Sequence, residues 1–252
     1  MWSDGLHASS LGERVSMSVE QDCPSGAALR RGFLVVVSGP SAAGKNTLLN
    51  AVLPRLPKAR YSVSATTRPP RPGEVHGRDY FFLTEEEFDQ KVARGEFLEW
   101  ATFVGYRYGT PRAFVERCLE EGSIVLMDID IQGAAQVKAR MPEAILVFVL
   151  PPSFKVLQER IVARGKDSPE AIARRMAEVH HELARLPEYD YVVFNHNLDD
   201  AVAALQSIIW AECCRAARYD TARLIAQFME DAPSSGGVSH GPAVSRRTSA
   251  KG

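Results

Sequence analysis

Residues 38–49, SGPSAAGKNTLL, hold the side chains whose types and spacing most directly indicate chemistry. A phosphate-binding loop needs a glycine, four residues, then Gly-Lys followed by serine or threonine. Gly39, Gly44 and Lys45 fit this pattern, and Asn46 stands where the hydroxyl residue is expected. The N–H groups of such a loop converge on an anion, and the next helix adds its positive N-terminal dipole. The predicted phosphate-binding residues are Gly39, Pro40, Ser41, Ala42, Ala43, Gly44, Lys45, Asn46 and Thr47.

Asn46 bears on whether this loop serves a metal ion. The residue after the lysine normally places a hydroxyl on Mg²⁺. An asparagine carbonyl oxygen is also an acceptable ligand for a hard cation, and phosphate oxygens and water supply most of the others. Asp128, near the end of the apolar run SIVLMDID, is the acidic residue expected at a second strand end. We expect Asn46 and Asp128 to serve Mg²⁺, Asp128 through water; a helix cap or loop role for Asp128 is the alternative.

Two segments between residues 61 and 112 carry a different set of polar side chains. In YSVSATTRPPRPGEVHGRDYFFL, arginines stand near serine, threonine and tyrosine, and arginine forks match phosphate oxygens bidentately. In GEFLEWATFVGYRYGTPR, Glu99 precedes a tryptophan. A carboxylate can accept two parallel hydrogen bonds from the N1–H and amino groups of guanine, whereas adenine would leave it unpaired. These segments indicate a guanine nucleotide site; a solvated arginine-rich loop and a surface glutamate are the alternative.

The elements that must position these residues are short apolar runs alternating with helical patterns. The apolar runs are 33–39, 123–130, 144–152 and 189–195. Because they are continuously apolar, they are typical of strands buried on both faces, and hence of a parallel sheet covered by helices. Capping residues mark three helix starts: Thr84 with Glu87, Ser153, and Ser168 before Pro169. The predicted fold class is α/β.

The whole chain excludes several classes of protein. At 252 residues it can bury the core of one elaborate domain. A formal net charge of −1 gives no reason to expect a nucleic-acid partner. No apolar run approaches the roughly 18 residues of a membrane span, so no membrane partner is expected. The four cysteines form no Cys-x-x-Cys pair, and the N-terminus lacks the apolar core of a secretory signal, so we expect reduced thiols and a cytoplasmic location.

Four ordered motifs within residues 32–215 resemble guanylate kinase: SVSATTRPPRPGEVHGRDYFF, GEFLEWATFVGYRYGT, MDIDIQGAAQVK and ARGKDSPEAIARRM. The resemblance implies the fold of a P-loop nucleoside monophosphate kinase, with a parallel-sheet core, an inserted GMP-binding subdomain and a helical lid. It also implies transfer of the γ-phosphate of ATP to GMP with Mg²⁺, and dGMP as a further acceptor. It leaves the oligomeric state open.

The domain boundaries follow from this resemblance and from composition. The guanylate-kinase-like domain is predicted at 32–227, with the GMP-binding insert at 62–113 and the lid at about 164–174. Residues 1–31 show no sustained helical or strand period, and residues 228–252 are rich in serine, glycine and proline. Both end segments are therefore predicted to be disordered tails.

The resemblance also implies roles for single residues. The implied guanine-reading residues are Ser64, Glu99 and Thr110, with Asp130 assisting. The implied ligands of the GMP phosphate are Arg68, Arg71, Tyr80 and Tyr108. The residues implied to act on the ATP phosphates and the transferred group are Lys45, Arg160, Arg164 and Arg175. Asn195 is implied to lie near the adenine.

Three positions depart from the family pattern. Ala42 stands where glycine is usual and adds a methyl group to a loop whose backbone prefers glycine torsions, while Asn46 puts the strength of Mg²⁺ binding in question. His196 stands where an acidic residue is common, and we assign it no role. Asn46 keeps open the alternative of a catalytically impaired guanylate-kinase-like protein-interaction module. A kinase for another monophosphate is a further alternative, which Glu99 disfavours.

Overall fold

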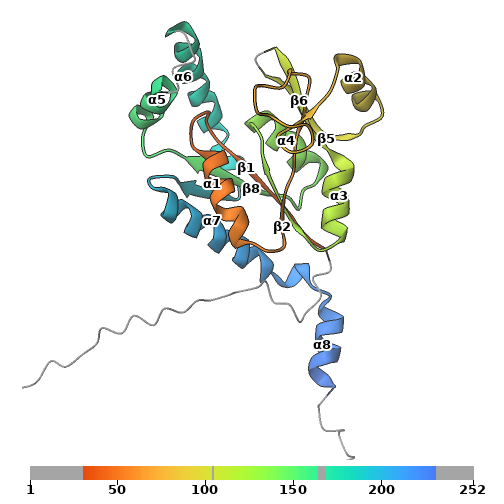
Figure 1. The fold of residues 1–252 in the computed structure, drawn as a ribbon. Helices are drawn as coiled ribbons and strands as arrows, with labels where there is room; N and C mark the ends of the chain where they lie inside the picture. The colour runs from red at the N-terminus through yellow and green to blue at the C-terminus, as the bar shows by residue number, and fades with distance from the viewer. Residues whose placement is uncertain (1–30, 104, 164–168, 231–252) are drawn as a thin grey trace, which may run out of the picture.

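The computed structural model describes residues 31–103, 105–163 and 169–230, and Figure 1 shows how they are arranged. The larger of its two sheets has five strands in the order β2-β7-β1-β8-β9, and all neighbouring strands are parallel. The predicted parallel core is therefore confirmed. Its strands are β1 (Leu34–Ser38), β2 (Ala59–Tyr61), β7 (Ile124–Asp128), β8 (Ile145–Leu150) and β9 (Tyr191–Phe194).

Helices cover both faces of this sheet (Figure 1). The helices α1 (Lys45–Val52) and α7 (Leu198–Cys213) share one apolar cluster with the sheet, and α3 (Arg112–Glu120) and α4 (Ile131–Arg140) share a second cluster. The central strands β1, β7 and β8 are almost wholly apolar because both of their faces are covered. The prediction that each continuous apolar run is buried on both faces is wrong for β9, an edge strand whose Phe194 is 58% exposed.

A second sheet, with strand order β4-β3-β6-β5, lies within the range predicted for the insert. The helix α2 (Glu85–Ala93) packs on it through Phe88, whose ring stacks on Phe97 with centroids 4.5 Å apart. The predicted capping box of Thr84 and Glu87 begins this helix. The strands are β3 (Ala65–Thr66), β4 (Phe81–Phe82), β5 (Phe97–Phe103) and β6 (Tyr106–Pro111).

Two helices, α5 (Phe154–Ala163) and α6 (Pro169–Ala184), pack together next to the phosphate loop (Figure 1). The predicted cap of α5 is confirmed, since Ser153 Oγ accepts the N–H of Val156 at 3.2 Å. Residues 164–168, which begin the expected lid and include the cap predicted at Ser168, lie outside the described residues.

The remaining elements connect or follow this framework. Three short 3-10 helices are η1 (Leu53–Arg55), η2 (Leu186–Glu188) and η3 (Ala216–Arg218). The last helix, α8 (Thr221–Met229), projects from the body (Figure 1), so the boundary predicted between 227 and 228 falls inside a helix. Of the N-terminal tail predicted at 1–31, only the last residue is described. Within the described part of the chain, no helix is long and apolar enough to cross a membrane.

Candidate active site

The segment joining β1 to α1 requires glycine at both ends. A Cβ atom at Gly39, whose φ is +135°, would lie 2.4 Å from the carbonyl oxygen of Val149 in β8. At Gly44, whose φ is +94°, a Cβ would lie 2.5 Å from Nδ2 of Asn195. Within the described residues no side chain caps α1 at Gly44. The first N–H groups of α1 are therefore available to an anion.

Ala42 lies within the same loop in a left-handed conformation, with φ +71°. The expectation that this position prefers glycine torsions is confirmed. A left-handed alanine costs roughly 1–2 kcal/mol. The Ala42 methyl group is nevertheless buried in an apolar cluster with Ile161 of α5 and Val179 of α6. The phosphate loop is thus packed directly against the helical pair.

Lys45, the first residue of α1, extends back over the loop. Its Nζ donates to the carbonyl oxygens of Gly39 and Pro40, at 2.7 and 3.3 Å, and lies 3.8 Å from Oδ1 of Asp128. Asp128 reaches this place because β7 pairs with β1. Burial raises the pKa of Asp128, and the charge of Lys45 opposes that rise. Asn46 follows Lys45 on the first turn of α1 and is exposed.

Three side chains from other elements converge on the loop. Nη1 of Arg175, in α6, donates to Oγ of Ser41 at 2.9 Å. Nδ2 of Asn195, just after β9, donates to the Ala43 carbonyl oxygen at 2.8 Å. Nη1 of Arg160, in α5, lies 3.5 Å from the same oxygen. The structure therefore brings two predicted arginines and the predicted asparagine to the loop.

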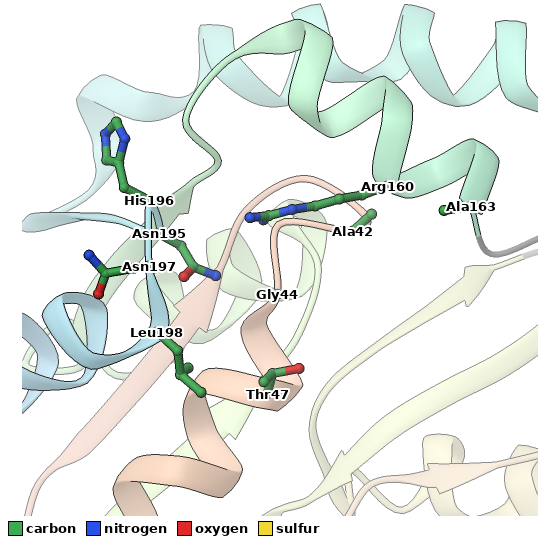
Figure 2. A pocket seen from close by; sticks show the side chains of 9 residues that line it. All are labelled: Ala42, Gly44, Thr47, Arg160, Ala163, Asn195, His196, Asn197 and Leu198. Carbon is green, nitrogen blue, oxygen red and sulfur yellow. The ribbon is translucent and has the colours of Figure 1, made fainter.

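Arg160 and Asn195 border a cavity of about 440 Å³ beside the loop (Figure 2). Its lining residues are Ala42, Gly44, Thr47, Arg160, Ala163, Asn195, His196, Asn197 and Leu198. The last four follow the carboxyl end of a parallel strand, where α/β sheets commonly bind ligands. Asn197, Leu198 and a role for His196 could not be predicted from the sequence, because this short loop carries no informative spacing. Arg164 lies outside the described residues.

A buried carboxylate marks the second half of the site. Glu99 in β5 lies opposite Thr110 in β6, and Oγ1 of Thr110 donates to Oε1 of Glu99 at 2.6 Å. Burial raises the pKa of Glu99 to about 7; the bond from Thr110 opposes the rise and the charge of Asp130 adds to it. Asp130 caps α4, accepting the Gly133 N–H at 2.8 Å. Ser64 is half-buried just before β3, two strands from Glu99.

Arg68 and two tyrosines form a polar cluster on the same subdomain. The guanidinium of Arg68, a residue only 7% exposed, lies 5.4 Å from the ring centroid of Tyr80. The rings of Tyr80 and Tyr108 meet edge to face, with centroids 5.9 Å apart. Glu74 accepts two hydrogen bonds from Arg68, at 3.0 and 2.9 Å. Glu74 could not be predicted from the sequence, because a carboxylate is not expected where a phosphate is to bind. Its two hydrogen bonds orient the guanidinium of Arg68.

The other arginines of this loop are exposed. The backbone N–H of Arg71 donates to Glu74 Oε2 at 2.7 Å, while the Arg71 side chain belongs to the surface. Arg78 donates to Asp79 at 3.0 Å and to the Gly73 carbonyl oxygen at 3.1 Å. Of the three arginines that the sequence places together, Arg68 is thus the one beside the tyrosines, and a role for Arg71 stays a prediction.

Charged groups link the two halves of the site. Burial raises the pKa of Tyr80, and the charge of Asp128 is among the further causes of that rise. Glu182 of α6 also has its pKa raised to about 7 by burial, against the effect of Lys45. A glutamate on an amphipathic helix reads as a solvent-facing residue, so sequence analysis did not reveal Glu182. Asp128 of β7 thus acts on Tyr80 of the insert, and Lys45 of the phosphate loop acts on Glu182 of α6.

This arrangement suits two phosphorylated molecules bound side by side. One set of cations and N–H groups surrounds the phosphate loop, and a separate arginine–tyrosine cluster lies near a carboxylate able to read a base. Among residues 31–103, 105–163 and 169–230, no group of three or more His, Cys, Asp or Glu side chains is placed to hold a metal ion. A Mg²⁺ ion here would take most of its ligands from phosphate oxygens and water.

Comparisons with known proteins agree with this geometry. The family model described as guanylate kinase matches residues 31–212. A guanylate kinase of Symbiobacterium thermophilum is 50% identical over 200 residues, which are 79% of this chain and 94% of that protein. One of Bradyrhizobium diazoefficiens is 50% identical over 184 residues, or 73% and 84% of the two chains. The crystal structure of guanylate kinase from Anaplasma phagocytophilum matches with a TM-score of 0.65 at 29% identity, covering 81% of this chain and 96% of that one.

Proposed function

This chain belongs to the guanylate kinase family, and from that premise we propose that it transfers the γ-phosphate of ATP to GMP, giving ADP and GDP. The observation that carries the proposal is the buried Glu99–Thr110 pair, with its 2.6 Å hydrogen bond, on the second sheet. An ionised carboxylate can accept more hydrogen bonds than Thr110 supplies, and the N1–H and amino groups of guanine offer two more.

On the donor side, the phosphate loop and Lys45 bind the ATP phosphates. The cavity beside the loop takes the adenosine, with Asn195 near the base. Arg160 and Arg175 lie at the loop, where they neutralise charge that develops on the transferred group, together with Arg164. Phosphoryl transfer requires little covalent chemistry from the protein, so alignment and charge neutralisation supply most of the rate.

On the acceptor side, Arg68, Tyr80 and Tyr108 hold the GMP phosphate, with Arg71 joining them. A non-bridging oxygen of this phosphate attacks the γ-phosphorus, and ADP leaves with the electron pair of the broken P–O bond. Glu99 and Thr110 read guanine, with Ser64 and Asp130 assisting. Closure of the insert and the helical pair over both nucleotides excludes water, which would otherwise hydrolyse ATP.

Mg²⁺ is the proposed cofactor. When bound, it would neutralise part of the charge of the phosphate groups. The side chains present fit a weakly ligated ion: Asp128 offers a carboxylate 3.8 Å from Lys45 Nζ, and Asn46 offers a neutral oxygen on an exposed first turn. Asp128 would hold the ion through water, and Asn46 would hold it directly or through water.

The proposed setting is purine nucleotide metabolism in the cytoplasm, with ATP, GMP and dGMP as partners and no nucleic acid or membrane. The thiols of Cys118 and Cys214 and the net charge of −1 support this setting. The proposed domain limits stay at 32–227, with the insert at 62–113 and the lid at about 164–174; helix α8 runs past the first of these limits.

The function is tested by measuring ADP formation with GMP, dGMP, AMP and UMP at millimolar Mg²⁺ in a coupled assay. We expect turnover with GMP and dGMP and little with AMP or UMP. A preference for AMP would contradict the role of Glu99. No ADP with any acceptor would favour the interaction module that the exposed Asn46 keeps open.

A further inference from the structure

Helix α4 lies along the outer edge of β5, the strand that carries Glu99. Gly133, Gln136 and Arg140 are spaced three and four residues apart, so they share one face of α4. Each of them contacts or closely approaches the backbone or side chains of residues 97–100. The strand that reads guanine is thus held from outside its own sheet.

Gln136 pairs with the backbone next to Glu99 as a neighbouring strand would. Its Nε2 donates to the carbonyl oxygen of Trp100 at 2.9 Å, and its Oε1 accepts the Trp100 N–H at 3.3 Å. Because β5 is an edge strand, no strand in the described part of the chain pairs with these two backbone groups on that side. One side chain therefore satisfies both groups and fixes the direction of the chain directly after Glu99.

Gly133 leaves the room that the carboxylate needs. A Cβ atom at Gly133 would lie 2.7 Å from Oε2 and 3.2 Å from Cδ of Glu99. Gly133 is an interior residue of α4, so the requirement is for space rather than for an unusual backbone torsion. The carboxylate is consequently held between Thr110, which bonds Oε1, and the backbone of α4, which closes behind Oε2.

Arg140 supports an irregularity in the same strand. The register of β5 against β6 shifts between Phe97 and Glu99, which leaves Leu98 extra in the ladder. Nη1 of Arg140 donates to the carbonyl oxygen of Leu98 and lies 3.3 Å from that of Phe97. Bulges of this kind re-aim the side chains that follow them.

We propose that Gln136 and Gly133 are positioning residues for base recognition, which act through Glu99 and set how strongly guanine is preferred over a purine without the 2-amino group. The inference rests on the proposed function, because it needs Glu99 to read the acceptor base. Two parallel hydrogen bonds require the carboxylate plane to match the base edge, whereas one bond tolerates a rotated carboxylate. Loosening α4 therefore removes selectivity before it removes binding.

The test compares GMP with IMP, which keeps N1–H and lacks the 2-amino group. In Gln136→Ala we expect the ratio of kcat/KM for GMP to that for IMP to fall about tenfold, as for one lost hydrogen bond to a charged group, with KM for ATP unchanged. Gly133→Ala should lower the same ratio while the protein stays folded, because alanine is otherwise favoured in a helix. Gln90→Ala, on the exposed surface of α2, is the matched control and should leave the ratio unaltered.

Isothermal titration with GMP and with IMP in the absence of ATP separates this inference from the proposed function. If the wild-type protein forms no ADP with GMP, the proposed function fails. The ratio of the affinities for GMP and IMP then tests the inference by itself. A ratio that falls in either α4 variant and not in Gln90→Ala supports the positioning role. A ratio that stays unchanged in every α4 variant that folds, or a wild-type protein that binds both nucleotides equally, overturns it.

Discussion

Lowering the pH from 8 to 6 is predicted to weaken GMP binding about tenfold, because Glu99 loses its charge in this range. Burial raises the pKa of Glu99 to about 7. The carboxylate is then about 90% ionised at pH 8 and about 10% at pH 6. Only the ionised group can accept from both the N1–H and the amino group of guanine, so affinity follows the ionised fraction.

The measurement is the dissociation constant for GMP between pH 6 and pH 8, with Glu99→Gln as the control. The second ionisation of the GMP phosphate, near pH 6, adds its own pH dependence, and this part persists in the variant. The difference between the two profiles isolates Glu99. Equal slopes for wild type and variant would refute the reasoning, as would GMP affinity of the wild-type protein that does not change with pH.

The same carboxylate predicts an effect on stability of the opposite sign. Its pKa rises from the usual 4.5 to about 7 on folding, so the folded protein binds the proton more tightly. Stability is therefore lost as pH rises from about 4.5 to about 7, and the loss of about 3 kcal/mol persists at higher pH. Glu99→Gln, neutral at every pH, should melt at a higher temperature than wild type at pH 8 without nucleotide; a lower melting temperature would contradict the buried-charge account.

Further predictions concern the phosphate loop. Asn46→Ser should lower the Mg²⁺ concentration for half-maximal rate, and a Mg²⁺ titration that does not move would remove this residue from the metal. Lys45→Met should lower kcat at least a hundredfold with little change in KM for GMP, since its ammonium acts on the transferred group; a kcat near wild type in steady-state assays would refute that role. Gly39→Ala should lower the free energy of unfolding by at least about 2 kcal/mol in denaturant titration, because its Cβ would lie 2.4 Å from a carbonyl oxygen of β8. A smaller loss of stability would show that β8 can move. In Ala42→Gly, the relief of the left-handed torsion offsets the loss of the buried methyl group. The free energy of unfolding in the same titration should therefore change by no more than about 1 kcal/mol. A larger change would mean that one of the two effects dominates.

Sequence patterns could predict the parts of this fold that rest on local regularity. The continuous apolar runs gave three central strands because those strands are covered on both faces. The same rule failed at the edge strand β9, where one face is left open, and it could not detect β2, which has only three residues. The glycines of the phosphate loop could be recognised in the sequence because they are required where the loop backbone closely approaches β8 and Asn195.

The rest of the site depends on contacts between distant segments. Nothing in the local sequence shows that Glu74 accepts hydrogen bonds from Arg68. The arginines of this loop predict a phosphate site whether or not Glu74 is considered. Gln136 meets Trp100 across 36 positions of the chain, and an amide on a helix has no spacing signal that names its partner. His196 enters the cavity wall only because β9 ends beside the loop.

Transfer of label from γ-³²P ATP tests the central claim most directly. With GMP and Mg²⁺ present, the account predicts that the label appears in GDP, in amounts equal to the ADP formed, and that Glu99→Gln reduces this transfer strongly. Label released only as inorganic phosphate, or left in ATP at every GMP concentration, would contradict the account.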